Sequence, residues 1–201
     1  MGIEGKTGAG WHGADLHGAD LHGADLHGAD LIEKIRKIKV LILDVDGVLT
    51  DGRIIISDDG QETKCFNVRD GHGLKLIQRA GIEVILLTGR KSRVVDHRAR
   101  ELGIKKVYQG ALDKLSVFNE ILAAEGLVPE QVACMGDDIV DLPVLRRSGF
   151  SITVSDAHDE VLRAVDLVTK NPGGRGAVRE VCEMILKTQG TWEELMGRYR
   201  A

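Results

Sequence analysis

The stretch Lys39–Gly52 reads K-V-L-I-L-D-V-D-G-V-L-T-D-G, and the rest of the chain is organised around it. Its apolar run, Val40–Leu43, predicts a strand that is buried on both faces, as in a parallel sheet. Asp44 and Asp46 follow at once, and residues two apart in an extended chain point the same way. Both carboxylates therefore leave the carboxyl end of the strand on one side, where they repel each other unless a cation lies between them. The alternative is an ordinary strand end with a turn aspartate before a glycine, and the later strands decide between the two.

The composition describes one main soluble domain. The chain has 201 residues, of which 43% are hydrophobic and 29% charged, as is typical of soluble globular proteins. The net charge of −4 and the lack of a basic run argue against a nucleic-acid partner, and no apolar run is long enough to span a bilayer. Cys65, Cys134 and Cys182 form no C-x-x-C pair, which indicates reduced thiols. We therefore expect a cytoplasmic protein with no nucleic-acid or membrane partner.

The N-terminal segment is a repeat. Residues 12–31 read H-G-A-D-L four times, with a period of five residues. Because five residues advance a helix by about 140°, the repeat leucines would scatter around a helix instead of sharing one face. The unit resembles that of pentapeptide-repeat proteins, in which each five residues form one side of a square right-handed β-helix. The resemblance implies a single coil with four leucines pointing inward, namely Leu16, Leu21, Leu26 and Leu31.

A single coil cannot bury its own leucines, because solenoid repeats need stacked neighbours. The alternative interpretation is a flexible, Gly-rich extension without a catalytic role. The histidines of the repeat match no helical pair of metal ligands; they are His12, His17, His22 and His27. We place a domain boundary after Leu31, so that residues 1–31 form the repeat extension and residues 32–201 the main domain.

The main domain alternates between strand and helix patterns. Gly52–Phe66 contains two β-rich arms around the turn S-D-D-G, which predicts a β-hairpin over the carboxyl edge of the sheet. Strands that alternate with helices predict parallel pairing with right-handed crossovers, and hence a three-layer α/β/α domain. The strands expected after the first are residues 83–87, 106–108, 131–135, 151–154 and 167–168. The expected helices are residues 31–37, 70–80, 92–102, 112–125, a helix from residue 157, and 176–187.

Polar residues suited to holding a metal ion follow the first strand and two later ones. Asp44 and Asp46 follow the first strand, while Thr88 and Asp137 come directly after later strands. In open α/β sheets, ligands bind at the carboxyl ends of the strands. Converging carboxylates need a divalent cation, and ligation by oxygen alone favours Mg²⁺ over zinc. We therefore expect a Mg²⁺ site at this edge of the sheet.

The same edge offers groups for a phosphate. Thr88 supplies a hydroxyl, and the backbone N–H groups at Gly89 stand beside a helix start, which suits a phosphate oxygen. Lys114 lies near the start of its helix, where it can neutralise the remaining charge and fix the side chain of Asp44.

These residues resemble the four motifs of the haloacid dehalogenase superfamily of phosphatases. The motifs are D-V-D-G-V at residues 44–48, T-G-R at residues 88–90, Lys114, and G-D-D-I-V-D at residues 136–141. The resemblance implies that Asp44 is the nucleophile that becomes an aspartyl-phosphate and that Asp46 is the acid and base. It also implies that Thr88 and Lys114 bind the phosphoryl oxygens.

The resemblance implies a metal site as well. Mg²⁺ would be held by Asp44, by the backbone carbonyl of Asp46 and by Asp137, and it would offset the charge that develops during the reaction. Asp138 and Asp141 have two interpretations, as partners of the metal and its waters or as helix caps.

Four further strings resemble the 3-deoxy-D-manno-octulosonate 8-phosphate phosphatase family within this superfamily. They are L-T-D-G at residues 49–52, F-N-V-R-D-G at 66–71, T-G-R-K-S at 88–92 and G-G-R-G-A-V-R-E-V at 173–181. The resemblance implies removal of phosphate from a small phosphorylated acidic sugar during lipopolysaccharide precursor synthesis. It also implies a homotetramer without a cap domain, in which the hairpins gather around the central axis and neighbouring subunits cover each site.

The sugar needs donors and acceptors beyond the phosphate site, since it carries hydroxyls and a carboxylate. The glycine-rich stretch Gly173–Gly176 has the composition of a flexible loop that can fold over the mouth of the site. The candidate sugar contacts are Asn67, Arg69, Asp70, Gly89, Arg90, Arg98 and Arg175.

Three other functions are compatible with parts of the sequence. A nine-carbon keto-acid sugar 9-phosphate, of the nononate or sialic acid type, would use the same residue types. A non-catalytic regulatory module is a second alternative, although it would need no acid and base two residues after the nucleophile Asp44. A scaffold assembled through the repeat extension is a third.

Overall fold

The structure is a computed structural model in which residues 26–200 are described. A six-stranded sheet forms its centre, with the order β5-β4-β1-β6-β7-β8 and only parallel pairings. The first predicted strand is β1 (Val40–Leu43), which lies between β4 (Glu83–Thr88) and β6 (Val132–Met135). The other strands are β5 (Lys106–Gln109), β7 (Phe150–Thr153) and β8 (Leu167–Val168). The predicted parallel sheet is confirmed.

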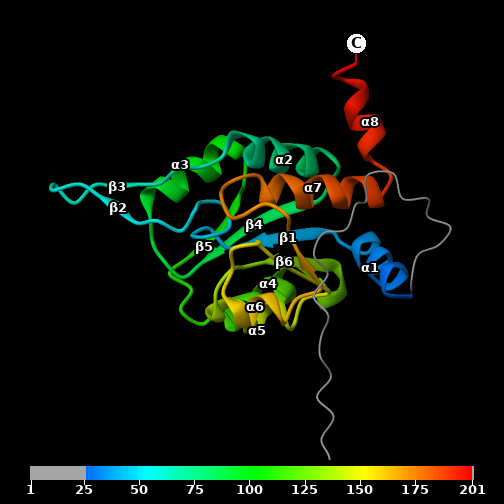
Figure 1. The fold of residues 1–201 in the computed structure, drawn as a ribbon, viewed down its shortest axis with the longest axis horizontal. Coiled ribbons are helices and arrows are strands. Elements are labelled where there is room, and N and C mark those ends of the chain that lie inside the picture. Colours follow the sequence, from blue (N-terminus) through cyan, green and yellow to red (C-terminus); the bar gives the residue numbers. More distant parts are fainter. Residues whose placement is uncertain (1–25, 201) are drawn as a thin grey trace, which may run out of the picture.

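Helices cover both faces of the sheet and give the predicted three layers (Figure 1). One face carries α2 (Val68–Arg79), α3 (Arg93–Leu102) and α7 (Ala177–Thr188). The other face carries α4 (Lys114–Glu125), α5 (Leu142–Leu145) and α6 (Asp159–Leu162). Two 3₁₀ turns, Pro129–Gln131 and Ile139–Asp141, flank β6. A short C-terminal helix, α8 (Trp192–Gly197), follows α7 and was not predicted.

The sequence pattern of α7 decides which of its faces is buried. Val178, Val181 and Ile185 recur at helical spacing, and all three are completely buried. Moving a side chain of this size out of water stabilises the fold by about 1.5–3 kcal/mol. α7 packs along α2, where Gly73 allows the backbones to approach, since a Cβ there would lie 3.1 Å from the Arg179 Cα.

The N-terminal prediction requires a correction at the last repeat unit only. α1 (Leu26–Arg36) begins inside the last repeat unit, so residues 26–31 are helical and form no side of a β-helix, and the boundary placed after Leu31 falls within this helix. The helix is favoured by packing, because Leu31 packs against the core and Ile35 is buried in it. A single β-helix coil without stacked neighbours cannot bury its leucines in this way. Residues 12–25, including Leu16 and Leu21, lie outside the described part of the chain.

The predicted hairpin is present. β2 (Ile55–Ile56) and β3 (Glu62–Thr63) pair antiparallel, and the hairpin extends away from the rest of the domain (Figure 1). Its first arm carries three consecutive isoleucines that are 54%, 42% and 61% exposed, at Ile54, Ile55 and Ile56. In the part of the chain that the structure describes, no helix has the length and apolar character needed to cross a membrane.

Candidate active site

Three carboxylates meet at the carboxyl ends of two neighbouring strands. Asp44 directly follows β1, and Asp137 follows β6 after one glycine. Asp44, Asp137 and Asp141 each offer an oxygen, and these oxygens all lie within 4.8 Å of one another. We call these three residues the carboxylate cluster. The predicted approach of Asp44 and Asp137 is therefore observed, and Asp141 joins them.

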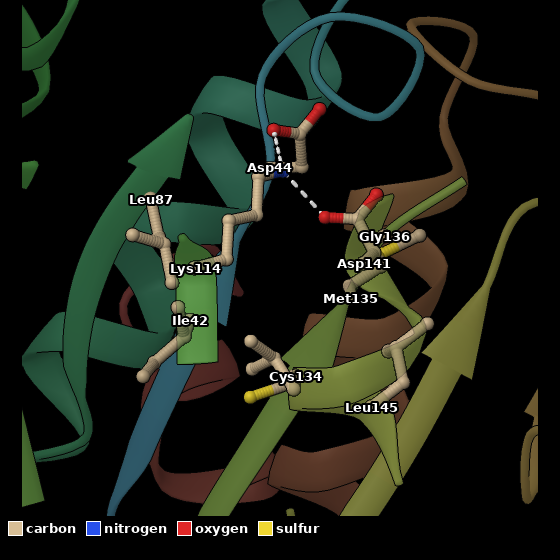
Figure 2. A pocket seen from close by; sticks show the side chains of 10 residues that line it. Ile42, Asp44, Leu87, Lys114, Cys134, Met135, Gly136, Asp141 and Leu145 are labelled. Atoms are coloured by element: carbon tan, nitrogen blue, oxygen red, sulfur yellow. Dashed lines mark hydrogen bonds and ion pairs between the residues drawn. The ribbon is translucent and has the colours of Figure 1, made fainter. Parts of the chain in front are cut away.

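Lys114 closes one side of the carboxylate cluster. It is the first residue of α4, whose N-cap is Asp113. Its Nζ donates to Asp44 Oδ1 at 2.7 Å and to Asp141 Oδ1 at 2.5 Å (Figure 2). The lysine is only 5% exposed, so solvent screens these ion pairs weakly. A small cavity beneath the pair is lined by Ile42, Leu87, Cys134 and other residues (Figure 2).

The electrostatics of the carboxylate cluster favour a cation. Burial raises the pKa of Asp44 to about 6; the positive charge of Lys114 opposes this rise, and repulsion from Asp141 adds to it. Burial, followed by repulsion from Asp44 and Asp141, raises the pKa of Asp137 to about 7. Burial alone would lower the pKa of Lys114, but the two carboxylates beside it raise it. One lysine thus leaves negative charge uncompensated, and a divalent cation would relieve it.

Asp138 and Asp141 differ in what they contact. The Asp138 side chain accepts a hydrogen bond from the backbone N–H of Ile139 at 2.7 Å and caps the 3₁₀ turn, which supports its interpretation as a cap. Asp141 is buried; its Oδ2 accepts the backbone N–H groups of Asp137 at 3.2 Å and of Asp138 at 3.3 Å, and its Oδ1 accepts from Lys114. Asp141 therefore orders the turn after β6 and also belongs to the carboxylate cluster.

The loop after Asp44 is shaped by Thr50 and Gly47. The buried Thr50 hydroxyl oxygen accepts the N–H groups of Gly47 at 3.4 Å and Gly52 at 3.2 Å. Gly47 has φ 98°, and a Cβ at this position would lie 1.9 Å from Asp137 Oδ2. Only glycine lets the Asp137 carboxylate approach the backbone beside Asp46 so closely.

The predicted phosphate-binding residues lie at the same edge of the sheet. β1 and β4 pair with Leu43 opposite Leu86, so Thr88 at the end of β4 stands beside the start of the Asp44 loop. Thr88 is buried, and its Oγ1 accepts the backbone N–H of Arg90 at 3.4 Å. Gly89 is partly exposed between them.

Asp46 has partners that the sequence did not predict. Lys64, directly after β3, contacts Asp46 Oδ1 through its Nζ and lies 3.3 Å from Glu62 Oε1. Arg90 places its Nε 3.6 Å from Asp46 Oδ2 and donates from Nη2 to Glu62 at 2.8 Å. We call Asp46, Glu62, Lys64 and Arg90 the hairpin cluster. The only sequence signal was a lysine two residues after a glutamate on one arm, which is common on solvent-exposed hairpins.

Two predicted sugar contacts, Asn67 before α2 and Arg98 on α3, contact each other. Asn67 caps α2 by accepting the N–H of Arg69 at 2.8 Å. Arg98 donates to the carbonyl of Asn67 at 3.3 Å and to Glu101 at 2.8 Å, and its guanidinium lies 5.5 Å from the Phe66 ring centre. Two other predicted sugar contacts, Arg69 and Arg175, are exposed.

Asp70 is a correction to the predicted sugar contacts. It is 1% exposed, and its carboxylate accepts the backbone N–H groups of Gly176 at 3.1 Å and Arg179 at 2.8 Å. Burial raises the pKa of this carboxyl, and the two N–H donors oppose that rise. Asp70 therefore fixes the start of α7 instead of facing a ligand.

The glycine-rich stretch before α7 is a second correction. It was expected to be a flexible loop, but Gly174 donates to the carbonyl of Val48 at 2.9 Å and Gly173 donates to Asp156 Oδ1 at 2.9 Å. A Cβ on Gly173 would lie 1.7 Å from the carbonyl oxygen of Gly47. The glycines serve close backbone packing against the Asp44 loop, which holds that loop in place.

Comparison with known proteins places this fold and site in a family. A family model described as haloacid dehalogenase-like hydrolase matches residues 106–180, and one for pentapeptide repeats matches residues 7–33. The chain is a hydrolase of the haloacid dehalogenase-like class, as its identity to the following relative shows. The 3-deoxy-D-manno-octulosonate 8-phosphate phosphatase KdsC of Escherichia coli K12 is 47% identical over 168 residues, which span 84% of this chain and 89% of the relative. The chain belongs to the KdsC family of phosphatases.

Solved structures agree with this assignment. The 3-deoxy-D-manno-octulosonate 8-phosphate phosphatase of Moraxella catarrhalis, in complex with magnesium, phosphate and KDO, matches with a TM-score of 0.83 at 40% identity, over 85% of this chain and 98% of that one. The enzyme of the same description from Yersinia pestis matches with a TM-score of 0.80 at 46% identity, over 82% of this chain and 89% of that one.

Proposed function

We propose that this protein hydrolyses 3-deoxy-D-manno-octulosonate 8-phosphate to the free sugar acid and inorganic phosphate, in lipopolysaccharide precursor synthesis. The observation that carries the proposal is the carboxylate cluster, in which Asp44, Asp137 and Asp141 lie within 4.8 Å of one another beside Lys114. The 47% identity to the Escherichia coli phosphatase supports the choice of an eight-carbon sugar over a nine-carbon one.

The residues of the carboxylate cluster fit a divalent cation. The donors are all carboxylate oxygens, as Mg²⁺ prefers, and the pKa values of Asp44 and Asp137 are raised while their charges are uncompensated. Asp44 and Asp137, with the backbone carbonyl of Asp46, would hold the ion, and Asp141 would hold it or its waters. When bound, Mg²⁺ supplies electrostatic stabilisation of the charge on the transferring phosphoryl group.

In the first step, an Asp44 carboxylate oxygen attacks phosphorus and forms an aspartyl-phosphate. The bond between phosphorus and the sugar oxygen breaks, and Asp46 gives its proton to that oxygen as the sugar leaves. Thr88 and Lys114 bind phosphoryl oxygens, and Lys114 also holds Asp44 in the attacking orientation through its 2.7 Å contact.

In the second step, water attacks the phosphorus of the aspartyl-phosphate. Asp46, now ionised, takes one proton from this water, and the bond between phosphorus and Asp44 breaks. Inorganic phosphate and the original carboxylate of Asp44 are released, and Asp46 is protonated for the next cycle.

We also propose that the protein is a homotetramer whose hairpins meet. Three consecutive isoleucines on the hairpin, Ile54, Ile55 and Ile56, are each more than 40% exposed, and contact with other subunits would bury them. Neighbouring subunits would then cover the open site and bring further groups to the sugar. The sugar contacts proposed from this chain are Asn67, Arg69, Gly89, Arg90, Arg98 and Arg175. Free thiols at Cys65, Cys134 and Cys182 fit the proposed cytoplasmic location.

The test is a comparison of substrates. The kcat/KM for phosphate release is measured in Mg²⁺ buffer with the eight-carbon 8-phosphate and with nine-carbon nononate and sialic acid 9-phosphates. We expect the eight-carbon substrate to be preferred by at least about tenfold, which corresponds to about 1.4 kcal/mol in transition-state stabilisation. Preference for a nine-carbon substrate would replace the proposed substrate, and absence of Mg²⁺-dependent release from all three would remove the proposal.

A further inference from the structure

A lysine from the hairpin is buried against the proposed acid and base. The Lys64 side chain is 1% exposed, its Nζ contacts Asp46 Oδ1, and it lies 3.3 Å from Glu62 Oε1. An ammonium group is costly to remove from water unless carboxylates compensate for the loss. Lys64 has two such carboxylates, and one of them is Asp46. The burial of the Lys64 ammonium group therefore depends in part on its ion pair with Asp46.

The second cation of the hairpin cluster meets the other oxygen of Asp46. Arg90 Nε lies 3.6 Å from Asp46 Oδ2, while its Nη2 donates to Glu62 at 2.8 Å. With Asp46 ionised, as it is before it takes a proton from the attacking water, two cations and two carboxylates leave the hairpin cluster without net charge. Lys64 and Arg90 thus each engage one oxygen of Asp46, which restricts rotation of its side chain.

These contacts draw Asp46 to one side of the site. Asp46 stands two residues after Asp44, so its carboxylate leaves the chain near the carboxylate cluster, where a divalent cation would attract it. The contact with Lys64 holds it toward the hairpin instead. A carboxylate that ligates a metal is a poorer proton carrier, so this separation of roles serves the chemistry.

We propose that Lys64 is a positioning residue that holds the Asp46 side chain in the orientation needed for proton transfer to the leaving oxygen. This inference rests on the proposed function, in which Asp46 is the acid and base. Glu62 supports Lys64 from the other side, so the base of the hairpin is part of the catalytic apparatus even though Lys64 touches no reacting atom.

The dependence on the leaving group distinguishes positioning from general damage. A sugar phosphate leaves as an alkoxide, which needs a proton, whereas p-nitrophenyl phosphate releases a stable phenolate that needs none. A misplaced Asp46 therefore slows the sugar phosphate more than the aryl phosphate. A loosened fold or a damaged phosphate site slows both substrates by the same factor.

The experiment compares kcat and KM of Lys64→Met with wild type on both substrates. We expect kcat for the octulosonate 8-phosphate to fall by about 10–100-fold, with KM and the p-nitrophenyl phosphate kcat within about threefold. Lys64→Arg keeps the charge and should recover part of the loss. The double variant with Asp46→Asn should be no slower than Asp46→Asn alone, because both changes remove the same function.

Lys106→Met is the matched control. Lys106 also bridges two carboxylates, Glu83 at 2.8 Å and Glu125 at 2.6 Å, but it lies at the first residue of β5, near the opposite edge of the sheet. Its removal should leave both rates unchanged. If Lys64→Met fails to fold, Glu62→Gln replaces it, with a smaller shift of the same rate ratio expected.

An equal loss on both substrates in the folded variants, or losses that multiply with those of Asp46→Asn, would overturn the assignment of Lys64. Failure of the proposed function has a different signature. If Asp44→Asn keeps full activity, the mechanism is wrong. If wild type does not hydrolyse the octulosonate 8-phosphate but hydrolyses other alkyl phosphates, only the proposed substrate is wrong. Lys64→Met and wild type are then compared on one of those alkyl phosphates and on p-nitrophenyl phosphate.

Discussion

The active site is assembled from two charged clusters that the chain supports in different ways. The carboxylate cluster stands on the ends of β1 and β6 and on the turn after β6, and Lys114 at the start of α4 is buried against it. The hairpin cluster joins Asp46 to side chains from β3, its following residue and the turn after β4. The first cluster is carried by the core of the sheet, while half of the second comes from a two-stranded hairpin that extends away from it (Figure 1).

The difference in support between the two clusters matches a difference in their proposed functions. Nucleophilic attack and metal binding need fixed distances, which parallel strands packed on both faces provide. Proton transfer also needs an orientation, but here it depends on a hairpin whose first arm carries three exposed isoleucines. The predictions below test whether the two clusters can be separated by mutation.

The largest effect is expected for Asp44, the proposed nucleophile. Asp44→Asn keeps the size of the side chain but cannot form the aspartyl-phosphate, so turnover of every phosphate ester should fall by at least about 10⁴-fold. Phosphate release is the measurement, with Lys106→Met as a control that keeps full activity. Residual turnover within tenfold of wild type would show that Asp44 is not the nucleophile.

The second largest effect is expected for Asp46, the proposed acid and base. Asp46→Asn should slow the sugar phosphate by about 10²–10⁴-fold, and p-nitrophenyl phosphate much less. Full activity of Asp46→Asn on the sugar phosphate would remove Asp46 from the mechanism and with it the role of the hairpin cluster.

The third prediction concerns the metal. Asp137→Asn removes one carboxylate of the cluster while Asp44 and Lys114 remain, so apparent Mg²⁺ affinity should fall by about 100-fold or more. Calorimetric titration measures this directly, and Asp138→Asn is the matched control because Asp138 caps a turn. Equal loss of affinity in both variants would contradict the assignment of the metal ligands.

The carboxylate cluster also predicts a pH dependence with a definite sign. In the metal-free protein the pKa of Asp44 is about 6 and that of Asp137 about 7, both above the ordinary value of 3.8. The unfolded chain loses these protons at lower pH than the folded protein, so the free energy of unfolding should fall as the pH rises from about 4 to about 7.

Added Mg²⁺ replaces the protons, so it should raise the Tm more near pH 8 than near pH 5. Scanning calorimetry with and without Mg²⁺ tests this. In Asp137→Asn, the fall in the free energy of unfolding between about pH 4 and about pH 7 should be smaller than in wild type. A Tm response to Mg²⁺ that is independent of pH would contradict the raised pKa values.

A smaller effect is expected at the tip of the hairpin. Ile56→Asp places a charge on a residue that is 61% exposed and should leave the fold intact, but it should dissociate the proposed tetramer and lower kcat/KM several-fold. Light scattering and kinetics measure the two effects. Val128 is 52% exposed and lies outside the hairpin, so Val128→Asp should change neither the oligomeric state nor kcat/KM.

The smallest effect concerns the N-terminal repeat. Deleting residues 1–25 leaves α1 whole and should keep turnover within about twofold, or about 0.4 kcal/mol. Deleting residues 1–31 instead cuts into α1 and removes Leu31 from the core, so it should lower the Tm. Loss of activity beyond tenfold with the shorter deletion would assign the repeat a functional role.

The sequence predicted the sheet, its order of strands and helices, and the approach of Asp44 and Asp137, while it left the role of Asp141 open. Each of these follows from local patterns, since a polar residue after a buried strand must lie at the sheet edge. Lys64 could not be predicted, because its burial depends on how the hairpin folds back on Asp46. Asp70 and Gly173 were misjudged for the same reason, as their partners lie more than 100 residues away along the chain, in α7 and in the Asp44 loop respectively.

The most direct test of the central claim is a crystal structure of the protein grown with Mn²⁺ in place of Mg²⁺, with the ion located by anomalous scattering. The account predicts one strong peak at the carboxylate cluster, with oxygens of Asp44 and Asp137 about 2.1 Å from it and the Asp46 carboxylate still held by Lys64. A peak elsewhere, or one without Asp44 and Asp137 among its ligands, would contradict it.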